Sequence, residues 1–376
     1  MAALRRTGWV WHERYAWHDT GYGAGHLSAG GWVQPGISFA ESAGAKKRFR
    51  DLVAASGLAD HLVAIAPRPA TEAELLRLHT ADYVEHIRSL SASGGGRTGA
   101  DGDVTPVGID SYEIAVLAVG GALAAVEAVV AGEVENAYAL IRPPGHHAEA
   151  ALARGFCLFG NTALAALHAR QGLGIERVAI VDWDVHHGNG TEDAFYDDPS
   201  VLTISLHGDD DYPPGRGAIE DRGAGAGEGF NLNIALPEGS GSGAYVAAFE
   251  RVVVPALHAY QPDLVLVASG LDASAADPLG RQNVHSDGFR EMTRLVREAA
   301  QELCQGRLVC IHEGGYSEAY VPFCGVAVLE TLAGERRVED PFLEGLVARP
   351  GQQLQPHQDT AIRRAEALVE RVPTRG

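Results

Sequence analysis

The sequence predicts an α/β fold in which a largely parallel β-sheet is covered by helices on both faces. Short runs typical of buried strands alternate along the chain with Ala-rich stretches typical of helices. Nearly every strand-like run ends in a polar cluster, namely RPPGHH, DWDVHH, SLH, SGLDAS and HEGGY. Ligands of open parallel sheets bind at the carboxyl ends of the strands. We therefore expect the five clusters to meet at one edge of the sheet and to form a site there.

The expected strands and helices follow one another along the chain. The strands are residues 136–142, 177–184, 201–207, 263–270 and 307–315. The helices are residues 114–132, 161–171, 242–260 and 286–303, the last capped by Ser286 and Asp287. Residues 91–106 and 207–229 are rich in Gly, Ser and Asp and predict long loops of the kind that bind ligands. Residues 363–376 predict a last helix and a frayed tail.

The composition is that of an ordinary globular protein, which we interpret as one domain over residues 1–376. We see no apolar run that approaches the roughly 18–20 residues of a membrane span. The formal net charge of -19 disfavours nonspecific binding to nucleic acid and would attract cationic substrates. The four cysteines form no CxxC pair, and no apolar segment follows the N-terminal arginines, so we expect reduced thiols and a cytoplasmic protein.

A candidate metal site begins with Asp184 and His186, which stand two positions apart at the end of an expected strand. Alternate residues of an extended segment point the same way, so this pair makes half a metal site. Asp272, which follows another expected strand, could complete it. Three protein ligands with an open position are typical of catalytic zinc, and two carboxylates with one histidine also suit Fe²⁺. An Asp-x-His pair alone also occurs as an ordinary capping or surface feature.

The turn RPPGHH adds two adjacent histidines, His146 and His147, to the predicted site. Such a pair can act as a general base with an electrostatic partner. Asp182 and Asn189 could each hold the Nδ1–H of one imidazole and set its tautomer. Tyr316, after two glycines, could donate a hydrogen bond to a developing oxyanion. Taken singly, the histidines could be a surface pair and the tyrosine an ordinary packed residue.

Together these motifs resemble the zinc-dependent histone deacetylase family. The resemblance rests on RPPGHHA, GFCLFGN, VDWDVHHGNGTEDAFYDDPSVLTISLH, SGLDASAADPLG and EGGYS, in this order and spacing. It extends over about residues 10–345 and is closest to the class II branch and to bacterial histone deacetylase-like amidohydrolases. It implies the arginase–deacetylase fold, with an eight-stranded parallel sheet and the active site at the carboxyl ends of the strands.

The resemblance also implies an amide hydrolysis in which water attacks, a tetrahedral oxyanion forms, and acetate and a free amine leave. The implied residues are Asp184, His186 and Asp272 for zinc; His146 with Asp182 for electrostatic assistance; His147 with Asn189 as general base and then acid; and Tyr316 for polarising the carbonyl.

Monovalent cations, usually potassium, are a further implication of the resemblance. The implied ligands of one site are the side chains of Asp182 and Ser205 with the carbonyls of Asp184, His186 and Leu206; those of a second site are mainly the carbonyls of Phe195, Asp198, Val201 and Phe230.

A narrow tunnel for an acyl-lysine stem is implied as well. Phe156 would form one wall, and Gly155 would contribute a carbonyl. The opposite wall is usually Phe in the family, whereas Tyr212 stands here. The rim aspartate that grips substrate backbone amides corresponds to either Asp101 or Asp103.

The identity of the substrate stays open. We favour an acetyl-lysine peptide or a related acylamide, and the alternative is an acetylated polyamine. Leu279 stands where some polyamine-specific relatives carry a glutamate, whereas Glu149 and the aspartates at 209–211 could form another acidic rim. The remaining alternatives are a binuclear manganese ureohydrolase and a non-catalytic acyl-lysine reader. We expect no nucleic-acid or membrane partner, and we expect a homodimer or homotetramer, as is common among the bacterial relatives.

Overall fold

The computed structural model describes residues 5–24, 27–28, 32, 34, 37–99, 103 and 105–374. At its centre is an eight-stranded sheet in the order β11-β10-β9-β12-β13-β8-β1-β5, in which all neighbouring strands are parallel. This confirms the predicted fold class. The strands are β1 (Thr7–Val10), β5 (Leu62–Ile65), β8 (Asn136–Ala139), β9 (Val178–Asp182), β10 (Val201–Gly208), β11 (Asn231–Leu236), β12 (Leu264–Ser269) and β13 (Leu308–His312).

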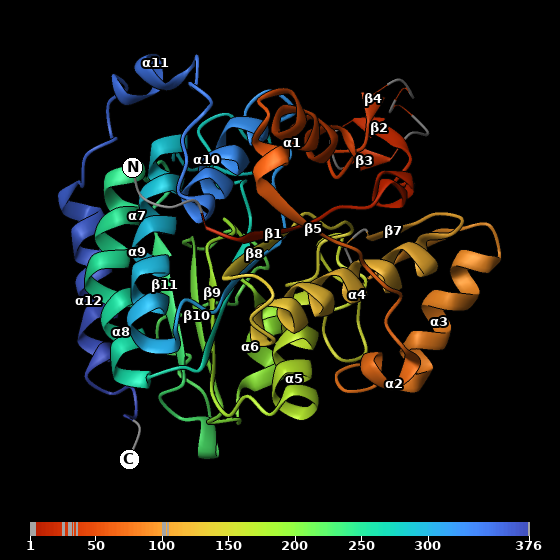
Figure 1. Ribbon diagram of the computed structural model, residues 1–376, viewed down its shortest axis with the longest axis horizontal. Coiled ribbons are helices and arrows are strands. Elements are labelled where there is room, and N and C mark those ends of the chain that lie inside the picture. The colour runs from red at the N-terminus through yellow and green to blue at the C-terminus, as the bar shows by residue number, and fades with distance from the viewer. Residues whose placement is uncertain are drawn as a thin grey trace.

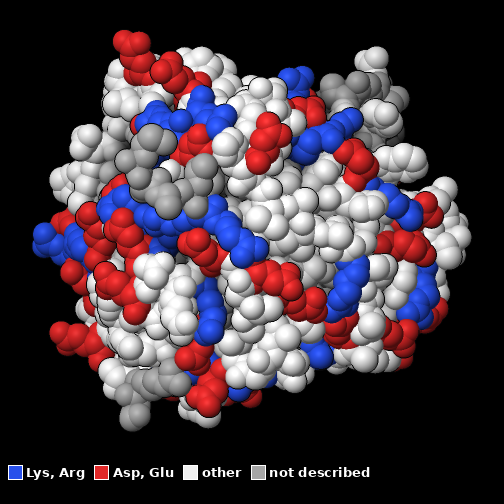
Figure 2. All heavy atoms as spheres, viewed as in Figure 1, with Lys and Arg blue, Asp and Glu red and all other residues white. Residues whose placement is uncertain are grey.

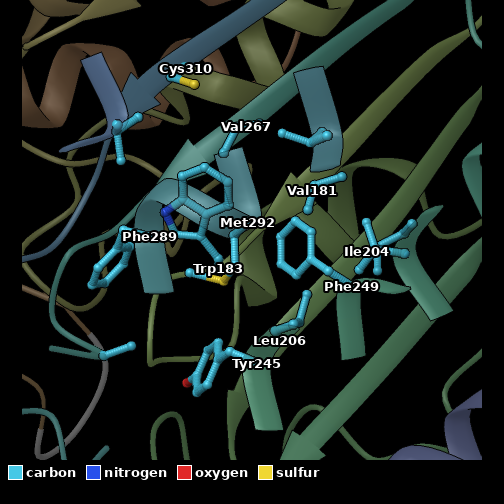
Figure 3. Close-up of a cluster of buried hydrophobic side chains, with 14 of the residues drawn as sticks. Val181, Trp183, Ile204, Leu206, Tyr245, Phe249, Val267, Phe289, Met292 and Cys310 are labelled. Atoms are coloured by element: carbon cyan, nitrogen blue, oxygen red, sulfur yellow. The ribbon is translucent and has the colours of Figure 1, made fainter. Parts of the chain in front are cut away.

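Both faces of the sheet are buried, because apolar side chains follow one another without interruption along the central strands. Successive residues of a strand point to opposite faces. Val181 and Val267 accordingly pack into one core with Trp183, whereas Ile180 and Leu266 pack into the other. Figure 3 shows the first of these cores, with Trp183 among aromatic and aliphatic side chains.

Each core is closed by its own layer of helices, which lie on either side of the sheet in Figure 1. The first core is covered by α1 (Gly44–Ala55), α7 (Ser242–Ala248), α8 (Val254–Tyr260), α9 (Ser286–Cys304), α10 (Val321–Ala333), α11 (Leu343–Val347) and α12 (Pro356–Val369). The second core is covered by α2 (Glu72–Leu75), α3 (Ala81–Ala92), α4 (Ser111–Val130), α5 (Asn161–Leu173) and α6 (Asn189–Phe195).

Helix α4 is longer and more apolar than the sequence analysis suggested for any segment of the chain. Within the described part of the chain it is the one helix that is long and apolar enough to cross a membrane, by length and composition only. Of its most apolar window, 78% is buried inside the protein, which is typical of a core helix. A side chain at Gly120 would place a Cβ only 1.6 Å from the carbonyl oxygen of Arg68, so a glycine is needed for this close packing.

Several boundaries differ from those that the sequence predicts. Helix α9 is capped by His285, whose ring accepts a hydrogen bond from the Gly288 N–H, and not by Ser286 or Asp287. The expected helix 242–260 is α7 and α8 joined by a π-helical turn, Phe249–Val253. The expected loop 91–106 includes a short hairpin of β6 (Gly96–Thr98) and β7 (Thr105–Val107).

Smaller elements complete the described chain. They are the antiparallel strands β2 (Tyr22–Ala24), β3 (Leu27–Ser28) and β4 (Ile37–Ser38), and the 3₁₀ turns Glu13–Trp17, Leu58–His61 and Gly225–Gly227. Acidic and basic side chains are mixed over the face shown in Figure 2, where the net charge of -19 does not gather in one patch.

Candidate active site

The predicted polar clusters follow β8, β9, β12 and β13, which are neighbours in the order β9-β12-β13-β8. Because these strands are parallel, their carboxyl ends lie at one edge of the sheet. The side chains of Asp184, His186 and Asp272 meet there, with candidate ligand atoms all within 4.8 Å of one another. Nδ1 of His186 lies 3.1 Å from Asp184 Oδ1 and 3.2 Å from Asp272 Oδ2.

The surroundings of this cluster suit a metal cation. Asp272 Oδ2 is buried and, although it lies 3.2 Å from His186 Nδ1, accepts no hydrogen bond of good geometry from the described residues. Burial and the neighbouring Asp184 carboxylate raise the pKa of Asp272 to about 7, as expected when two carboxylates share a site. A Cβ at Gly314 would lie 2.0 Å from Asp272 Oδ2, so any side chain at this position would clash with the carboxylate. The donor set and the unpartnered oxygen therefore fit a divalent metal.

The two adjacent histidines lie beside this cluster with their rings 3.9 Å apart. Nδ1 of His146 is 2.9 Å from Asp182 Oδ2, and Nδ1 of His147 is 2.8 Å from Asn189 Oδ1. All four side chains are buried. The structure thus brings together both pairs that the sequence suggested, because α6 begins at Asn189 directly after the cluster that follows β9.

The two imidazoles differ in proton affinity. Burial lowers the pKa of His146, but the carboxylates of Asp184 and Asp182 outweigh it and raise the pKa to about 10. Burial and the neighbouring His146 hold the pKa of His147 well below its usual value of 6.5. The pKa values of the two imidazoles are thus moved in opposite directions, which suits an electrostatic role for His146 and a proton-accepting role for His147.

Tyr316, which follows β13, is buried. Asp277 fixes its backbone by accepting a hydrogen bond from the Tyr316 N–H at 2.7 Å. Lys46 lies over the phenol ring, with Nζ 5.1 Å from the ring centroid, and donates to the Gly315 carbonyl at 3.1 Å. Burial and the carboxylate of Asp272 raise the pKa of Tyr316 well above 10, so the phenol stays protonated and can donate a hydrogen bond.

Aromatic rings pack against Tyr316 and His147. The ring of Phe156 packs edge-on against Tyr316 with centroids 5.9 Å apart, and the ring of Tyr212 packs edge-on against His147 at 4.9 Å. Phe156 has a φ of 69°, an uncommon conformation for a residue with a side chain. A Cβ at Gly155 would lie 2.2 Å from the His147 ring, so only glycine allows this approach.

The hydroxyl of Tyr212 binds Asp103, one of the two candidate rim residues. The Tyr212 hydroxyl donates to Asp103 Oδ2 at 2.5 Å, and the same oxygen accepts from the Gly155 N–H at 3.2 Å. Asp103 therefore links Tyr212 to the segment of Gly155 and Phe156. The other candidate rim residue, Asp101, lies outside the described residues.

The comparisons with known proteins agree with this geometry. A family model for the histone deacetylase domain matches residues 40–332. A histone deacetylase-like amidohydrolase of Pseudomonas aeruginosa is 51% identical over 341 residues, which are 90% of this chain and 89% of the relative. Histone deacetylase 8 of Arabidopsis thaliana is 36% identical over 349 residues, 90% of each chain. The crystal structure of the HDA15 HD domain matches with a TM-score of 0.83 and 32% identity, covering 97% of this chain and 96% of that one.

The chain belongs to the histone deacetylase family. As a histone deacetylase-like amidohydrolase it is a hydrolase that acts on amides and depends on a metal, and Asp184, His186 and Asp272 form a group that could hold the ion.

The residues expected to bind monovalent cations in this deacetylase come from several elements, and three of them, Val201, Ser205 and Leu206, are in β10. The Ser205 hydroxyl is buried and lies 2.9 Å from His207 Nδ1. Leu206 is its neighbour on the strand. Three carbonyls of the second expected set accept backbone hydrogen bonds: Phe195 accepts from Asp198, Asp198 from Val201, and Phe230 from Thr203.

The expected acidic rim is only partly available. Glu149 is not free, because its carboxylate accepts from Asn189 Nδ2 at 2.9 Å and from Arg154 Nε at 3.1 Å. Asp209 and Asp210 are exposed. Leu279 is half-buried, and its N–H donates to Asp277 Oδ1 at 2.9 Å.

Three carboxylates that shape the site of this deacetylase were missed at the sequence level. Glu313 accepts from the Gly145 N–H at 2.6 Å and the His146 N–H at 3.1 Å, and so holds the histidine turn. Its place in HEGGY was a usable signal. The position of Asp277 directly before a proline was another, because Asp commonly organises such turns. Glu41 contacts Lys46, and no local pattern signals that pairing.

Proposed function

We propose that this histone deacetylase-like amidohydrolase removes acetyl or short acyl groups from lysine side chains, with zinc as its metal. The observation that carries the proposal is the Asp184–His186–Asp272 cluster, with its unpartnered carboxylate oxygen, beside a neutral His147 and a protonated Tyr316. Three ligands of this kind leave room for water and substrate at zinc. Ferrous iron is the alternative ion for a set with two carboxylates.

The residues divide the proton transfers between them. The bound metal supplies Lewis acidity for the acyl carbonyl and for water. His147, whose Nδ1 is held by Asn189, takes the proton of the attacking water at Nε2 and later gives it to the leaving amine. His146 stays cationic beside Asp182 and stabilises the developing negative charge. Tyr316 donates a hydrogen bond to the oxyanion.

Potassium would have a supporting role. We propose one ion at Asp182 and Ser205 with the carbonyls of Asp184, His186 and Leu206, where its charge would affect the basicity of His146. A second ion would bind the carbonyls of Phe195, Asp198, Val201 and Phe230.

The rim favours a peptide over a polyamine. Glu149 is engaged by two donors, and Leu279 offers no charge to a distal ammonium group. Asp103, attached to Tyr212 and Gly155, has a second carboxylate oxygen that could accept the backbone N–H groups of a substrate peptide. The proposed partner is therefore an acetylated lysine peptide or protein. We further propose a cytoplasmic location and a homo-oligomer.

The test compares kcat/KM of the zinc-loaded enzyme on an acetyl-lysine peptide and on a monoacetylated polyamine. We expect a preference for the peptide of at least about tenfold, equivalent to about 1.4 kcal/mol of transition-state discrimination. The reverse preference would show an acetylpolyamine amidohydrolase and would direct attention to Asp209 and Asp210. Binding of a hydroxamate without turnover of either substrate would indicate a reader, and two tightly bound metals per chain would indicate a ureohydrolase.

A further inference from the structure

A carboxylate lies directly behind the partner of His147. Glu149 follows the histidine pair by two residues, and its Oε1 accepts from Asn189 Nδ2 at 2.9 Å and from Arg154 Nε at 3.1 Å. Its backbone is also fixed, since its N–H donates to the Leu152 carbonyl at 2.9 Å and its carbonyl lies 3.1 Å from His79 Nδ1. Arg154, Glu149, Asn189 and His147 thus form one connected chain.

The chemistry of this chain decides which way the Asn189 amide points. An ionised carboxylate only accepts hydrogen bonds, whereas an amide has an accepting end and a donating end. Glu149 therefore requires the Asn189 NH₂ group to face it, and the Asn189 oxygen then faces His147. An oxygen at that position requires the proton of the neutral imidazole to be on Nδ1, which leaves Nε2 free to accept a proton.

We propose that Glu149 is a positioning residue for catalysis, which acts through Asn189 to hold His147 in the Nδ1–H tautomer. The inference rests on the proposed function, in which His147 is the general base. With the Asn189 amide rotated by half a turn, its NH₂ group would face Nδ1, the imidazole proton would move to Nε2, and the base would be lost.

The other contacts of Asn189 do not suffice to fix the amide. Its second donor contact, to the His147 carbonyl, is long at 3.4 Å. Arg154 would act in the opposite sense if Glu149 were absent, because the guanidinium is a donor and would attract the amide oxygen. The Glu149 carboxylate lies between the Arg154 guanidinium and the Asn189 NH₂ group. It thus keeps Arg154 from binding the amide oxygen of Asn189.

The first test replaces Glu149 by leucine, which removes the acceptor and leaves Arg154 in place. We expect kcat to fall by about tenfold or more, as for loss of a hydrogen bond to a charged group, with KM changed less than about twofold. Glu149→Gln is the matched control: its side-chain oxygen can still accept from Arg154 and Asn189, so kcat should stay within about threefold of the wild type. Glu149→Ala serves the same purpose if the leucine variant does not fold.

The second test is a rescue. Aspartate at position 189 accepts hydrogen bonds through either oxygen and needs no orienting partner. Glu149→Leu combined with Asn189→Asp should therefore recover most of the lost kcat, because the new carboxylate can accept from both Arg154 and His147. A merely structural role for Glu149 would leave the double variant no better than Glu149→Leu.

Nitrogen NMR of ¹⁵N-histidine-labelled protein gives a readout that does not depend on turnover. The His147 signals are assigned by their loss in His147→Ala. We expect the Nδ1–H tautomer in the wild type and Glu149→Gln, and the Nε2–H tautomer in Glu149→Leu. An Nδ1–H tautomer in Glu149→Leu would overturn the inference. A protein that hydrolyses no acylamide but shows the expected tautomers would overturn the proposed function and leave the orienting role of Glu149 intact.

Discussion

Replacing Glu41 by glutamine would remove one negative charge from a buried ion cluster beneath the active site. Glu41 is fully buried and lies 2.9 Å from Arg142 Nε and 3.1 Å from Lys46 Nζ, both of which are also buried. Burial raises the pKa of Glu41, but the two cations outweigh it and lower the pKa from 4.5 to about 2. This difference corresponds to about 3 kcal/mol in favour of the folded, ionised state.

The magnitude agrees with the cost of breaking a buried ion pair, which is about 3–5 kcal/mol. For a chain of 376 residues, a loss of about 3 kcal/mol lowers the melting temperature by about 4 °C. Because the folded pKa lies below the unfolded one, the contribution of Glu41 is fully present above about pH 4.5 and is lost as the pH falls towards 2. The wild type and Glu41→Gln should therefore differ most near neutral pH and converge in acid.

Thermal unfolding followed by circular dichroism at pH 7 and at about pH 3, where more than half of the contribution is lost, measures both effects. Glu318→Gln is the control, because Glu318 pairs with Arg48 at the surface, where such pairs contribute less than about 1 kcal/mol. A Glu41→Gln variant that melted within about 1 °C of the wild type at pH 7 would refute the reasoning.

Three further predictions concern the reaction. Asp184→Ala should lose both metal and activity, measured by metal analysis and peptide turnover, and wild-type activity would exclude Asp184 as a ligand. Tyr316→Phe should keep its metal while kcat falls by about 10²–10³, as for loss of an oxyanion donor, and an unchanged rate would remove Tyr316 from the mechanism. Tyr212→Phe should release Asp103 and raise KM for peptides by about tenfold, while leaving that for a small acetylamide unchanged; equal effects on both would contradict a role at the rim.

The sequence predicts the centre of the fold better than its edges. Strands β9, β12 and β13 were predicted because each is an apolar run followed by a polar cluster. The edge strands β5 and β11 and the neighbouring β1 were not predicted. β1 and β5 have only four residues each; β8 is as short, but the polar cluster RPPGHH that follows it revealed it. The predicted cap of α9, Ser286 with Asp287, was wrong. The N-cap is His285, which is not a common capping residue and accepts a hydrogen bond from the Gly288 N–H.

For the site, too, local patterns were predicted and long-range contacts were not. Local spacing places Asp184 and His186 on one side of a strand end, so these residues could be found without a structure. The ion cluster joins Glu41 and Lys46, near the N-terminus, to Arg142, and Lys46 reaches the Gly315 carbonyl 269 residues away. Contacts of this kind depend on how α1 packs against α10 and β8, which no local pattern encodes. The sequence likewise suggests only that Glu149 could belong to an acidic rim, because its contacts with Arg154 and Asn189 follow from the fold.

The charges at the site favour two kinds of cation together. Four buried carboxylates, those of Asp182, Asp184, Asp272 and Glu313, surround the cationic His146, and His186 is neutral when it binds a metal. If all are ionised, three negative charges remain in a region that excludes water, and burial accordingly raises the pKa of Asp272 and of Glu313 to about 7. A divalent ion at Asp184 and Asp272 with a monovalent ion near Asp182 would cancel that excess. The monovalent ion would then do more than stabilise a loop, because without it the site would neutralise itself by taking up a proton.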